Sequence, residues 1–295
     1  MKRRCFIHTT GGALFAANAL PTAAGESEAA MQEKFHISVA AWSWHKMFFN
    51  GEIKQIDQPK LAREAGATGL ELVNAFFPSP QYSYLKKLMK TAESEGIRIL
   101  LIMCDDEGDF SSPDFREQRQ AIVNHRKWID IAAVLGCHSI RVNAGEKHIS
   151  PDEDMKTAAA SFYELCQYAR QYGLNVIIEN HGQRTEDPKW LAKLIETVAA
   201  PNFGTLPDFG NFPQGTDLYK AIETLMPYAK AVSAKCYDFD EKGNETKIDF
   251  SRMMDIVLKA GYQGFVGVEF EGDRMSEIEG TKAGVKLLQR IQAGS

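Results

Sequence analysis

Residues 171–179 read QYGLNVIIE, and this stretch decides the fold because it joins a helix to a strand. Gly173 ends an amphipathic segment, and the β-branched run that follows closes on Glu179. Four further stretches repeat the phrase: EAGATGLEL (64–72), SEGIRILL (94–101), VLGCHSIRV (134–142) and KAGYQGFVGVE (259–269). Strands joined through helices must run parallel, so the repetition predicts a parallel sheet with helical cover.

Eight such units follow one another along the chain. The expected strands span 36–43, 69–73, 97–103, 139–143, 175–179, 203–208, 231–236 and 265–270. The expected helices span 58–65, 81–95, 114–135, 151–172, 188–198, 217–225, 251–259 and 278–291. Strand starts lie about 33 residues apart, the length of one strand–helix unit, so we predict a single-domain (β/α)8 TIM barrel over residues 26–295. A doubly wound open sheet is the alternative, but AAWSWHKMFF (40–49) lacks its glycine-rich fingerprint.

The first 25 residues form a separate segment. Lys2, Arg3 and Arg4 precede the small, apolar run GGALFAANAL (11–20), as in an export signal. The paired arginines and Phe6 resemble a twin-arginine signal, so we expect a periplasmic or otherwise exported protein after the signal is cleaved. An ordinary secretory signal or a disordered tail is the alternative interpretation.

Charge and composition argue against several partners. The chain has 34 basic and 39 acidic residues, and loss of three basic residues with the signal leaves 31, so the formal charge falls from −5 to −8. An acidic protein binds phosphate backbones poorly, which disfavours nucleic acid. No apolar run is long enough for a membrane span. The four cysteines beyond residue 5 have no CxxC spacing, which argues against a zinc ribbon or a disulfide framework.

Acidic side chains end three of the expected strands, namely Glu179, Asp208 and Glu269. In a (β/α)8 barrel these strand ends build the active site. Carboxylates about 5 Å apart repel by on the order of 3 kcal/mol per pair at an effective dielectric near 20, so protons or a positive charge must lie between them. A divalent cation with oxygen ligands, Mn or Mg in preference to Zn, is one solution. The ammonium of Lys235, on the same strand face as Ser233, is the other.

Four motifs carry a family resemblance: VIIENHG (176–182), GTLPDFGNF (204–212), VSAKCYDF (232–239) and VGVEFEGD (266–273). In their order and spacing they resemble the xylose-isomerase-like TIM-barrel family of sugar isomerases and epimerases, over nearly all of residues 35–295. That family includes ketose 3-epimerases, hydroxypyruvate isomerases, inosose dehydratases and, more distantly, endonuclease IV. The resemblance implies a metal-dependent sugar isomerase or epimerase whose partner is a small carbohydrate, and the N-terminal segment adds the expectation that this enzyme is exported.

The resemblance also implies one divalent metal held by Glu, Asp, His and Glu from strands five to eight. Carried over residue by residue, Glu179, Asp208 and Glu269 become ligands. The family's His-x-Lys phrase aligns with Ser233-Ala234-Lys235, so a serine stands where the family has its histidine. Many members also have a histidine three residues after the aspartate, and Asn211 occupies that position.

Three interpretations of the missing histidine stay open. His181 shares strand parity with Glu179, so its ring could approach the metal or act as a base. Water could fill the position. Alternatively, Lys235 could lie inside a degenerate metal site.

The implied chemistry is proton abstraction next to a sugar carbonyl, through an enediolate. Glu179 and Glu269 would remove and return the proton, with His181 and Lys235 as further catalytic candidates. The expected substrate-binding residues lie near strand ends: Trp44, Arg141, Asn211, Glu271 and Arg274. A homodimer is compatible with the sequence, because aromatic loops of such barrels often pair two copies.

Three other classes of protein compete with this one. A 3-keto-glycoside lyase or hydratase would stabilise the same developing charge. A non-catalytic sugar-binding barrel would explain Ser233 and Asn211 as lost chemistry. Endonuclease IV-like DNA repair would need a His-rich multi-zinc site and a basic groove, and the acidic mature chain disfavours it.

Overall fold

The computed structural model describes residues 34–144 and 146–294, so the predicted export signal over residues 1–25 lies outside the described residues. One eight-stranded parallel sheet runs in the order β6-β5-β4-β3-β2-β1-β8-β7. Its strands are β1 (His36–Ala40), β2 (Gly69–Val73), β3 (Arg98–Cys104), β4 (Ser139–Val142), β5 (Asn175–Glu179), β6 (Phe203–Leu206), β7 (Val232–Cys236) and β8 (Phe265–Phe270).

The sheet closes on itself between its two end strands, β6 and β7. Parallel bridges pair Thr205 with Ala229 and Asp208 with Ser233. Gly204 permits this approach, because a Cβ atom there would lie only 2.6 Å from the carbonyl oxygen of Tyr228. The closed sheet with its outer helices confirms the predicted (β/α)8 barrel.

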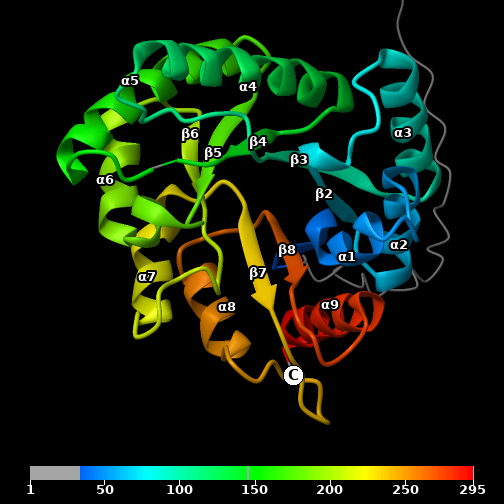
Figure 1. The fold of residues 1–295 in the computed structure, drawn as a ribbon. Coiled ribbons are helices and arrows are strands. Elements are labelled where there is room, and N and C mark those ends of the chain that lie inside the picture. The colour runs from blue at the N-terminus through cyan, green and yellow to red at the C-terminus, as the bar shows by residue number, and fades with distance from the viewer. Residues whose placement is uncertain (1–33, 145, 295) are drawn as a thin grey trace, which may run out of the picture. The chain divides into compact units, whose positions relative to one another are not determined.

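Helices surround the strands (Figure 1). They are α1 (His45–Phe49), α2 (Gln58–Ala65), α3 (Tyr82–Ser94), α4 (Phe115–Leu135), α5 (Pro151–Arg170), α6 (Pro188–Val198), α7 (Leu218–Leu225), α8 (Phe250–Lys259) and α9 (Glu277–Ala293). Short 3-10 turns are η1 (Ala41–Trp44), η2 (Gln55–Asp57), η3 (Asn74–Phe76), η4 (Gln183–Glu186) and η5 (Met226–Tyr228). Left-handed glycines end α2 and α4, at Gly66 and Gly136, as the repeated phrase predicts.

The first strand is shorter than predicted. Strand β1 ends at Ala40, and residues 41–49 form η1 and α1 instead of continuing to Ser43. The physical reason is a tertiary contact. The Ser43 hydroxyl donates to the Val268 carbonyl at 3.2 Å and accepts from the Phe270 amide at 3.0 Å, which turns the chain over the end of β8.

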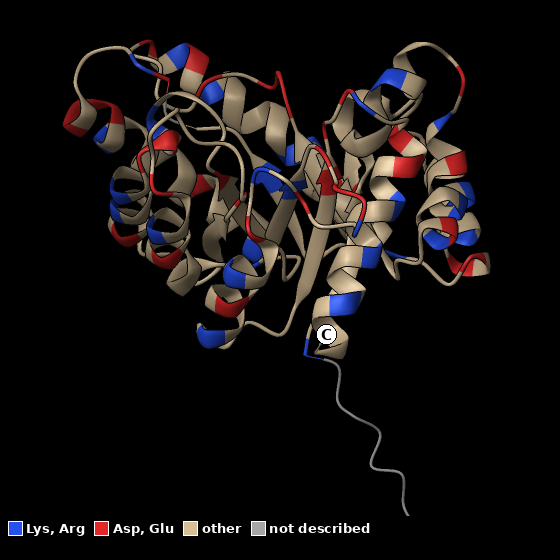
Figure 2. Cartoon of the chain, turned by 90° about the horizontal axis from the view of Figure 1, so that it is seen from below, with Lys and Arg blue, Asp and Glu red and all other residues tan. Residues whose placement is uncertain are grey.

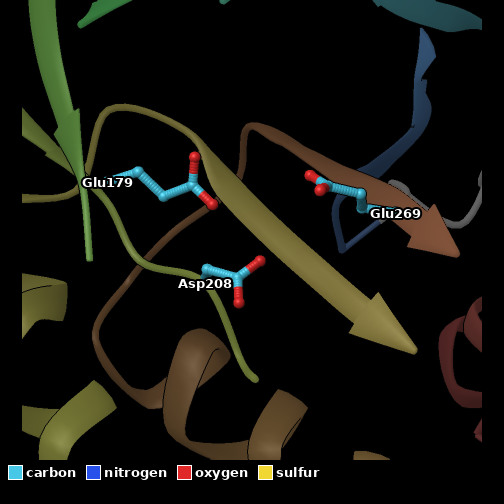
Figure 3. Close-up of side chains that lie close together, drawn as sticks. All are labelled: Glu179, Asp208 and Glu269. Carbon is cyan, nitrogen blue, oxygen red and sulfur yellow. The ribbon is translucent and has the colours of Figure 1, made fainter. Parts of the chain in front are cut away.

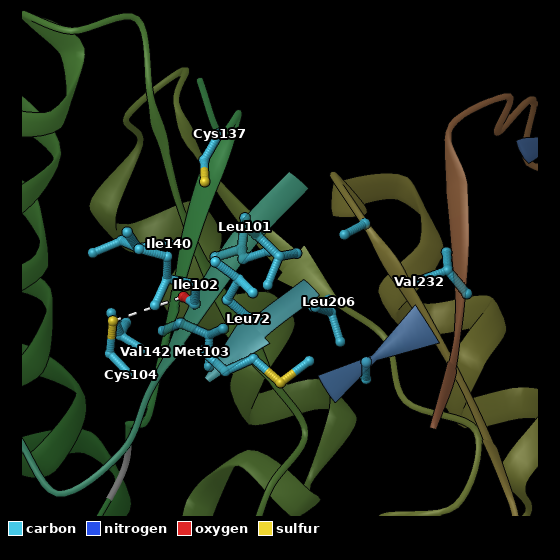
Figure 4. Close-up of a cluster of buried hydrophobic side chains, with 14 of the residues drawn as sticks. Leu72, Leu101, Ile102, Met103, Cys104, Cys137, Ile140, Val142, Leu206 and Val232 are labelled. Atoms are coloured by element: carbon cyan, nitrogen blue, oxygen red, sulfur yellow. Dashed lines mark hydrogen bonds between the residues drawn. The ribbon is translucent and has the colours of Figure 1, made fainter. Parts of the chain in front are cut away.

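The strand register decides which side chains face the barrel interior. Ser38, Gly267 and Ser233 are aligned across β1, β8 and β7, and Lys235 is aligned with Glu269. Because side chains alternate along a strand, these positions share one face. The opposite face packs beneath the helices. Figure 4 shows part of the apolar core, with Ile140 and Val142 on one side of the strands and Leu101 and Leu206 on the other.

Basic and acidic residues are interspersed along the surrounding helices (Figure 2). Among the described residues, no helix is long and apolar enough to cross a membrane.

Candidate active site

Three carboxylates meet where β5, β6 and β8 end. One carboxylate oxygen from each of Glu179, Asp208 and Glu269 lies within 4.8 Å of the other two. Figure 3 shows the three side chains converging from their separate strand ends. All three residues are at least 95% buried. Their convergence follows from the closed barrel, which brings the carboxyl ends of distant strands to one mouth.

An amide and a guanidinium contact the Glu179 carboxylate. The Asn211 amide donates to Glu179 Oε1 at 2.9 Å, and Arg141 Nε lies 3.1 Å from Glu179 Oε2. Arg141, on β4, also donates to Asp105 Oδ1 at 2.6 Å. This guanidinium outweighs the burial of Asp105 and holds the pKa of that carboxyl below its ordinary value. Arg141 is thus a buried cation shared by two carboxylates. Both Arg141 and Asn211 contact Glu179, and their substrate contacts stay predictions.

A turn fixes the orientation of Asp208. Its Oδ1 accepts hydrogen bonds from the backbone amides of Gly210 and Asn211, both at 2.8 Å. Its Oδ2 accepts from the Ser233 hydroxyl at 2.6 Å, and that hydroxyl lies 3.5 Å from Glu269 Oε2. Ser233 therefore lies between two of the three carboxylates, at the position where the family resemblance implies a histidine.

Lys235 lies inside the acidic cluster. Its ammonium is 2.8 Å from Glu269 Oε1 and 3.1 Å from Glu271 Oε2, and the side chain is 2% exposed. Although burial disfavours the charged form, Glu269 and Asp208 raise the pKa of Lys235 above its ordinary value, so this side chain is an ammonium. Trp42 completes the chain of contacts, because its indole N–H donates to Glu271 Oε1 at 2.7 Å.

Negative charge exceeds positive charge at this mouth. Glu179, Asp208, Glu269 and Glu271 face only two cations, Arg141 and Lys235, among these contacts. Burial is the main cause that raises the pKa of Glu179 well above its ordinary value, and repulsion from Glu269 and Asp208 adds to it. Burial likewise raises the pKa of Asp208 to about 6, against the opposing effect of Lys235. The isolated site therefore binds protons that a cation could replace.

The donor set fits a hard divalent cation. Glu179 Oε2 is buried and has no hydrogen bond within residues 34–144 and 146–294, although Arg141 lies nearby. The three converging ligands are carboxylate oxygens with no sulfur atom among them. Such a set is typical of Mn or Mg sites.

His181 does not join the carboxylate group. Among the described His, Cys, Asp and Glu side chains, the group contains only the three carboxylates. His181 follows β5, and its backbone amide donates to Thr185 Oγ1 at 2.9 Å. His181 is exposed to solvent, yet partial desolvation at the barrel mouth and the positive charge of Arg141 lower its pKa, which favours a neutral imidazole. The suggestion that His181 ligates the metal therefore gains no geometric support, whereas a role as a base stays a prediction.

Two predicted substrate-binding residues form no hydrogen bond or ion pair with the three carboxylates in the described structure. Trp44 is 1% exposed and belongs to the apolar core, and its indole nitrogen has no hydrogen-bond partner in the described part of the chain. Arg274 is largely exposed and donates to Asp238 Oδ2 at 2.7 Å. Substrate contacts for both stay predictions, and Trp42, not Trp44, supplies the indole that reaches Glu271.

Sequence reasoning missed two supporting residues. Asn180 is fully buried and links β5 to the end of β6, because its amide donates to the Asp208 carbonyl and accepts from the Asp208 amide. Gly210 gives Lys235 its space, since a Cβ atom there would lie 2.8 Å from Lys235 Cγ and 2.4 Å from Tyr237 Oη. The place of Asn180 directly after Glu179 could have indicated its role from the sequence. For Gly210, the sequence shows only a glycine near the end of a strand.

Comparison with known proteins identifies the class. The family model described as "Xylose isomerase-like TIM barrel" matches residues 59–291, so the chain belongs to this family. A relative from Mus musculus named "Putative hydroxypyruvate isomerase" is 26% identical over 255 residues, covering 75% of this chain and 86% of the relative. The family and its isomerase relatives confirm the predicted enzyme class of isomerase or epimerase.

Two further similarities extend the comparison. The C-glycoside deglycosidase alpha subunit of Arthrobacter globiformis is 39% identical over 54 residues, which are 18% of this chain and 15% of that protein. The crystal structure of a 3-keto-D-glucoside 4-epimerase from E. coli superposes with a TM-score of 0.69 at 14% identity, covering 87% of this chain and 99% of that one. At this identity the structural likeness shows the shared fold.

Proposed function

We propose that this protein is a metal-dependent sugar isomerase or epimerase that moves a proton next to a carbonyl group. The observation that carries the proposal is the convergence of three buried carboxylates at the barrel mouth. Among the described residues, Glu179 Oε2 accepts no hydrogen bond, and its contact there is the ion pair with Arg141. Burying several carboxylates together costs free energy, and groups perturbed in this way cluster at sites that use their charge or their protons.

Glu179, Asp208 and Glu269 would hold the divalent metal, and we propose Mn or Mg. When bound, such an ion withdraws electrons from a sugar's carbonyl and hydroxyl oxygens and offsets the negative charge of an enediolate. Ser233 contributes a hydroxyl beside two of these ligands in place of an imidazole.

The chain's own residues would move the proton. Glu179 and Glu269 come from strands that lie apart in the barrel order, so they approach a bound sugar from different directions. One carboxylate takes the proton from the carbon next to the carbonyl, and the other returns a proton to that carbon or its neighbour. Arg141 and Asn211 hold the first carboxylate, and Lys235 holds the second.

A lyase is the second candidate function. The same enediolate expels a leaving group from the next carbon when the substrate is a 3-keto-glycoside, so that the aglycone departs with the electrons of its bond. The local similarity to a C-glycoside deglycosidase subunit supports the lyase as the second candidate after the isomerase or epimerase.

Solvent exchange tests the shared step. Protein purified without chelator is assayed for bound Mn, Mg, Co and Zn, then incubated in D2O with free ketoses or with 3-keto-glycosides. Deuterium entering the carbon next to the carbonyl, together with an isomer or a released aglycone, is the expected result. Glu179→Gln and Glu269→Gln should abolish exchange, and exposed Glu223→Gln on α7 is the matched control. If the purified protein binds none of these metals and catalyses no exchange with free ketoses or with 3-keto-glycosides, the barrel is non-catalytic.

We also propose that the protein is exported with its first 25 residues as a signal. The support is the pair Arg3-Arg4 before a weakly apolar run. Replacing both arginines by lysine should retain full-length protein in the cytoplasm, whereas Lys2→Arg should leave export intact. Mass spectrometry of the exported N-terminus locates the cleavage site, and an intact Met1 on exported protein would contradict the proposal.

A further inference from the structure

A cavity of about 500 Å³ adjoins the carboxylates, a volume within the range of small-molecule sites. It lies among the loops that follow β4, β5 and β6, and we call it the β4–β6 hollow. Its polar and charged lining comprises Asn143, Glu146, His181, Gln183, Glu186 and Asn211. Asn211 connects the hollow to the carboxylates, because its amide donates to Glu179 Oε1 at 2.9 Å.

The charge of the lining has one sign. Glu146 and Glu186 are its carboxylates, and none of the described lysines and arginines lines this hollow. Within the part of the chain that the structure describes, neither glutamate forms an ion pair. Two unpaired carboxylates thus face a cavity that already borders an acidic cluster.

The nearby cationic side chains either form ion pairs with other carboxylates or lie outside the hollow. Arg141 pairs with Asp105 and Glu179. Arg184 pairs with Asp154 at 2.7 Å. Lys147 lines a neighbouring cavity, which shares Glu186 with the hollow. A bound anion would therefore meet two carboxylates and no free cation inside the hollow.

We propose that the β4–β6 hollow binds the uncharged, hydroxylated part of a sugar, and that Glu146 and Glu186 discriminate against phosphorylated or carboxylated sugars. Carboxylates and the amides of Asn143 and Gln183 can exchange hydrogen bonds with hydroxyl groups. The same carboxylates repel a phosphate or carboxylate group. This inference rests on the proposed function, and it departs from the relative named for hydroxypyruvate, whose substrate would carry a carboxylate.

The first test compares matched ligands. Metal-loaded protein is titrated calorimetrically with a panel of free ketoses and with the phosphate esters of the same ketoses. At least one free ketose should bind tenfold or more tightly than its ester, and the Glu146→Gln/Glu186→Gln double variant should narrow that ratio at least threefold. Glu223→Gln is the control. Equal affinity for the esters would overturn this inference alone, whereas failure of every ligand to bind or react would overturn the proposed function with it.

The second test needs no substrate. The cysteines at 104, 137, 166 and 236 are buried, so Gln183→Cys adds an exposed thiol to the hollow. Its alkylation by neutral iodoacetamide and by anionic iodoacetate is compared, with the parent protein giving the background rate. The rate with iodoacetamide divided by the rate with iodoacetate should be at least threefold higher for Gln183→Cys than for exposed Ser94→Cys on α3. Adding Glu146→Gln and Glu186→Gln to Gln183→Cys should lower this ratio. An unchanged ratio in the double variant would show that these two glutamates do not set the charge of the hollow.

Discussion

The ammonium of Lys235 lies 2.8 Å from Oε1 of Glu269, inside the carboxylate cluster and not at its edge. A buried cation at this position competes with a metal ion for the same carboxylate, since both are attracted by the same negative charge. The lysine thus offsets part of the excess negative charge of the site, as one interpretation of the sequence expected. Within residues 34–144 and 146–294, Glu179 Oε2 still accepts no hydrogen bond and has only its ion pair with Arg141.

Lys235→Met should therefore have two opposite effects. Removing one partner of a buried ion pair leaves Glu269 without its cation, so the metal-free protein should lose about 3 kcal/mol in its free energy of unfolding. Affinity for Mn should rise, because the competing charge is gone. Urea unfolding with and without Mn, and calorimetric titration of Mn, measure both effects, with exposed Lys220→Met on α7 as the control. Weaker Mn binding in Lys235→Met would contradict the competition.

Ser233→His should strengthen metal binding. The Ser233 hydroxyl is 2.6 Å from Asp208 Oδ2 and 3.5 Å from Glu269 Oε2, so an imidazole at this position would reach the carboxylates. A nitrogen ligand in place of a hydroxyl should raise the affinity for a divalent cation at least tenfold, or about 1.4 kcal/mol. Titration calorimetry compares Ser233→His with Ser233→Ala, which removes the hydroxyl without adding a ligand. Equal affinities for these two variants would show that position 233 does not face the metal.

Much of this site could be predicted because it depends on repetition. The recurring helix–glycine–strand phrase located the strands, and the barrel class then placed Glu179, Asp208 and Glu269 at one mouth. The strand face also predicted Lys235 beside Ser233. These inferences needed only strand order and the alternation of side chains.

Other features depend on contacts between distant segments, which no local pattern encodes. Trp42 and Trp44 differ by only two positions, yet one reaches Glu271 and the other lies in the core. The reason is the 3-10 turn that Ser43 secures against β8, where a continued strand was expected. The pairing of Arg141 with Asp105 likewise depends on the register between β3 and β4.

Gly210→Ala should disturb the site through Lys235. An added Cβ would lie 2.8 Å from Lys235 Cγ and 2.4 Å from Tyr237 Oη, so one of these side chains must move. We expect the Gly210→Ala protein to fold and to bind Mn more tightly than the parent, as Lys235→Met should. Its rate of proton exchange should fall at least tenfold. The control is Gly173→Ala, where a Cβ meets no atom within 4 Å and any cost is confined to the helix end. Unchanged Mn affinity in Gly210→Ala would show that Lys235 accommodates the methyl group.

His125 should make stability depend on pH, independently of the site. It is buried in α4, its ring Nδ1 lies 2.8 Å from the Ala121 carbonyl, and its ring centroid is 4.6 Å from that of Phe110. Burial lowers the pKa of His125 to about 4. Between that value and the ordinary value near 6.5, the unfolded chain binds a proton that the native protein does not. Stability should therefore fall as the pH drops through this window, by about 3 kcal/mol in total. Urea unfolding at pH 7.5, 5.5 and 4.5 should show a shallower decline of stability for His125→Gln than for the parent. Parallel curves for His125→Gln and the parent would mean that His125 titrates alike in the folded and unfolded chains.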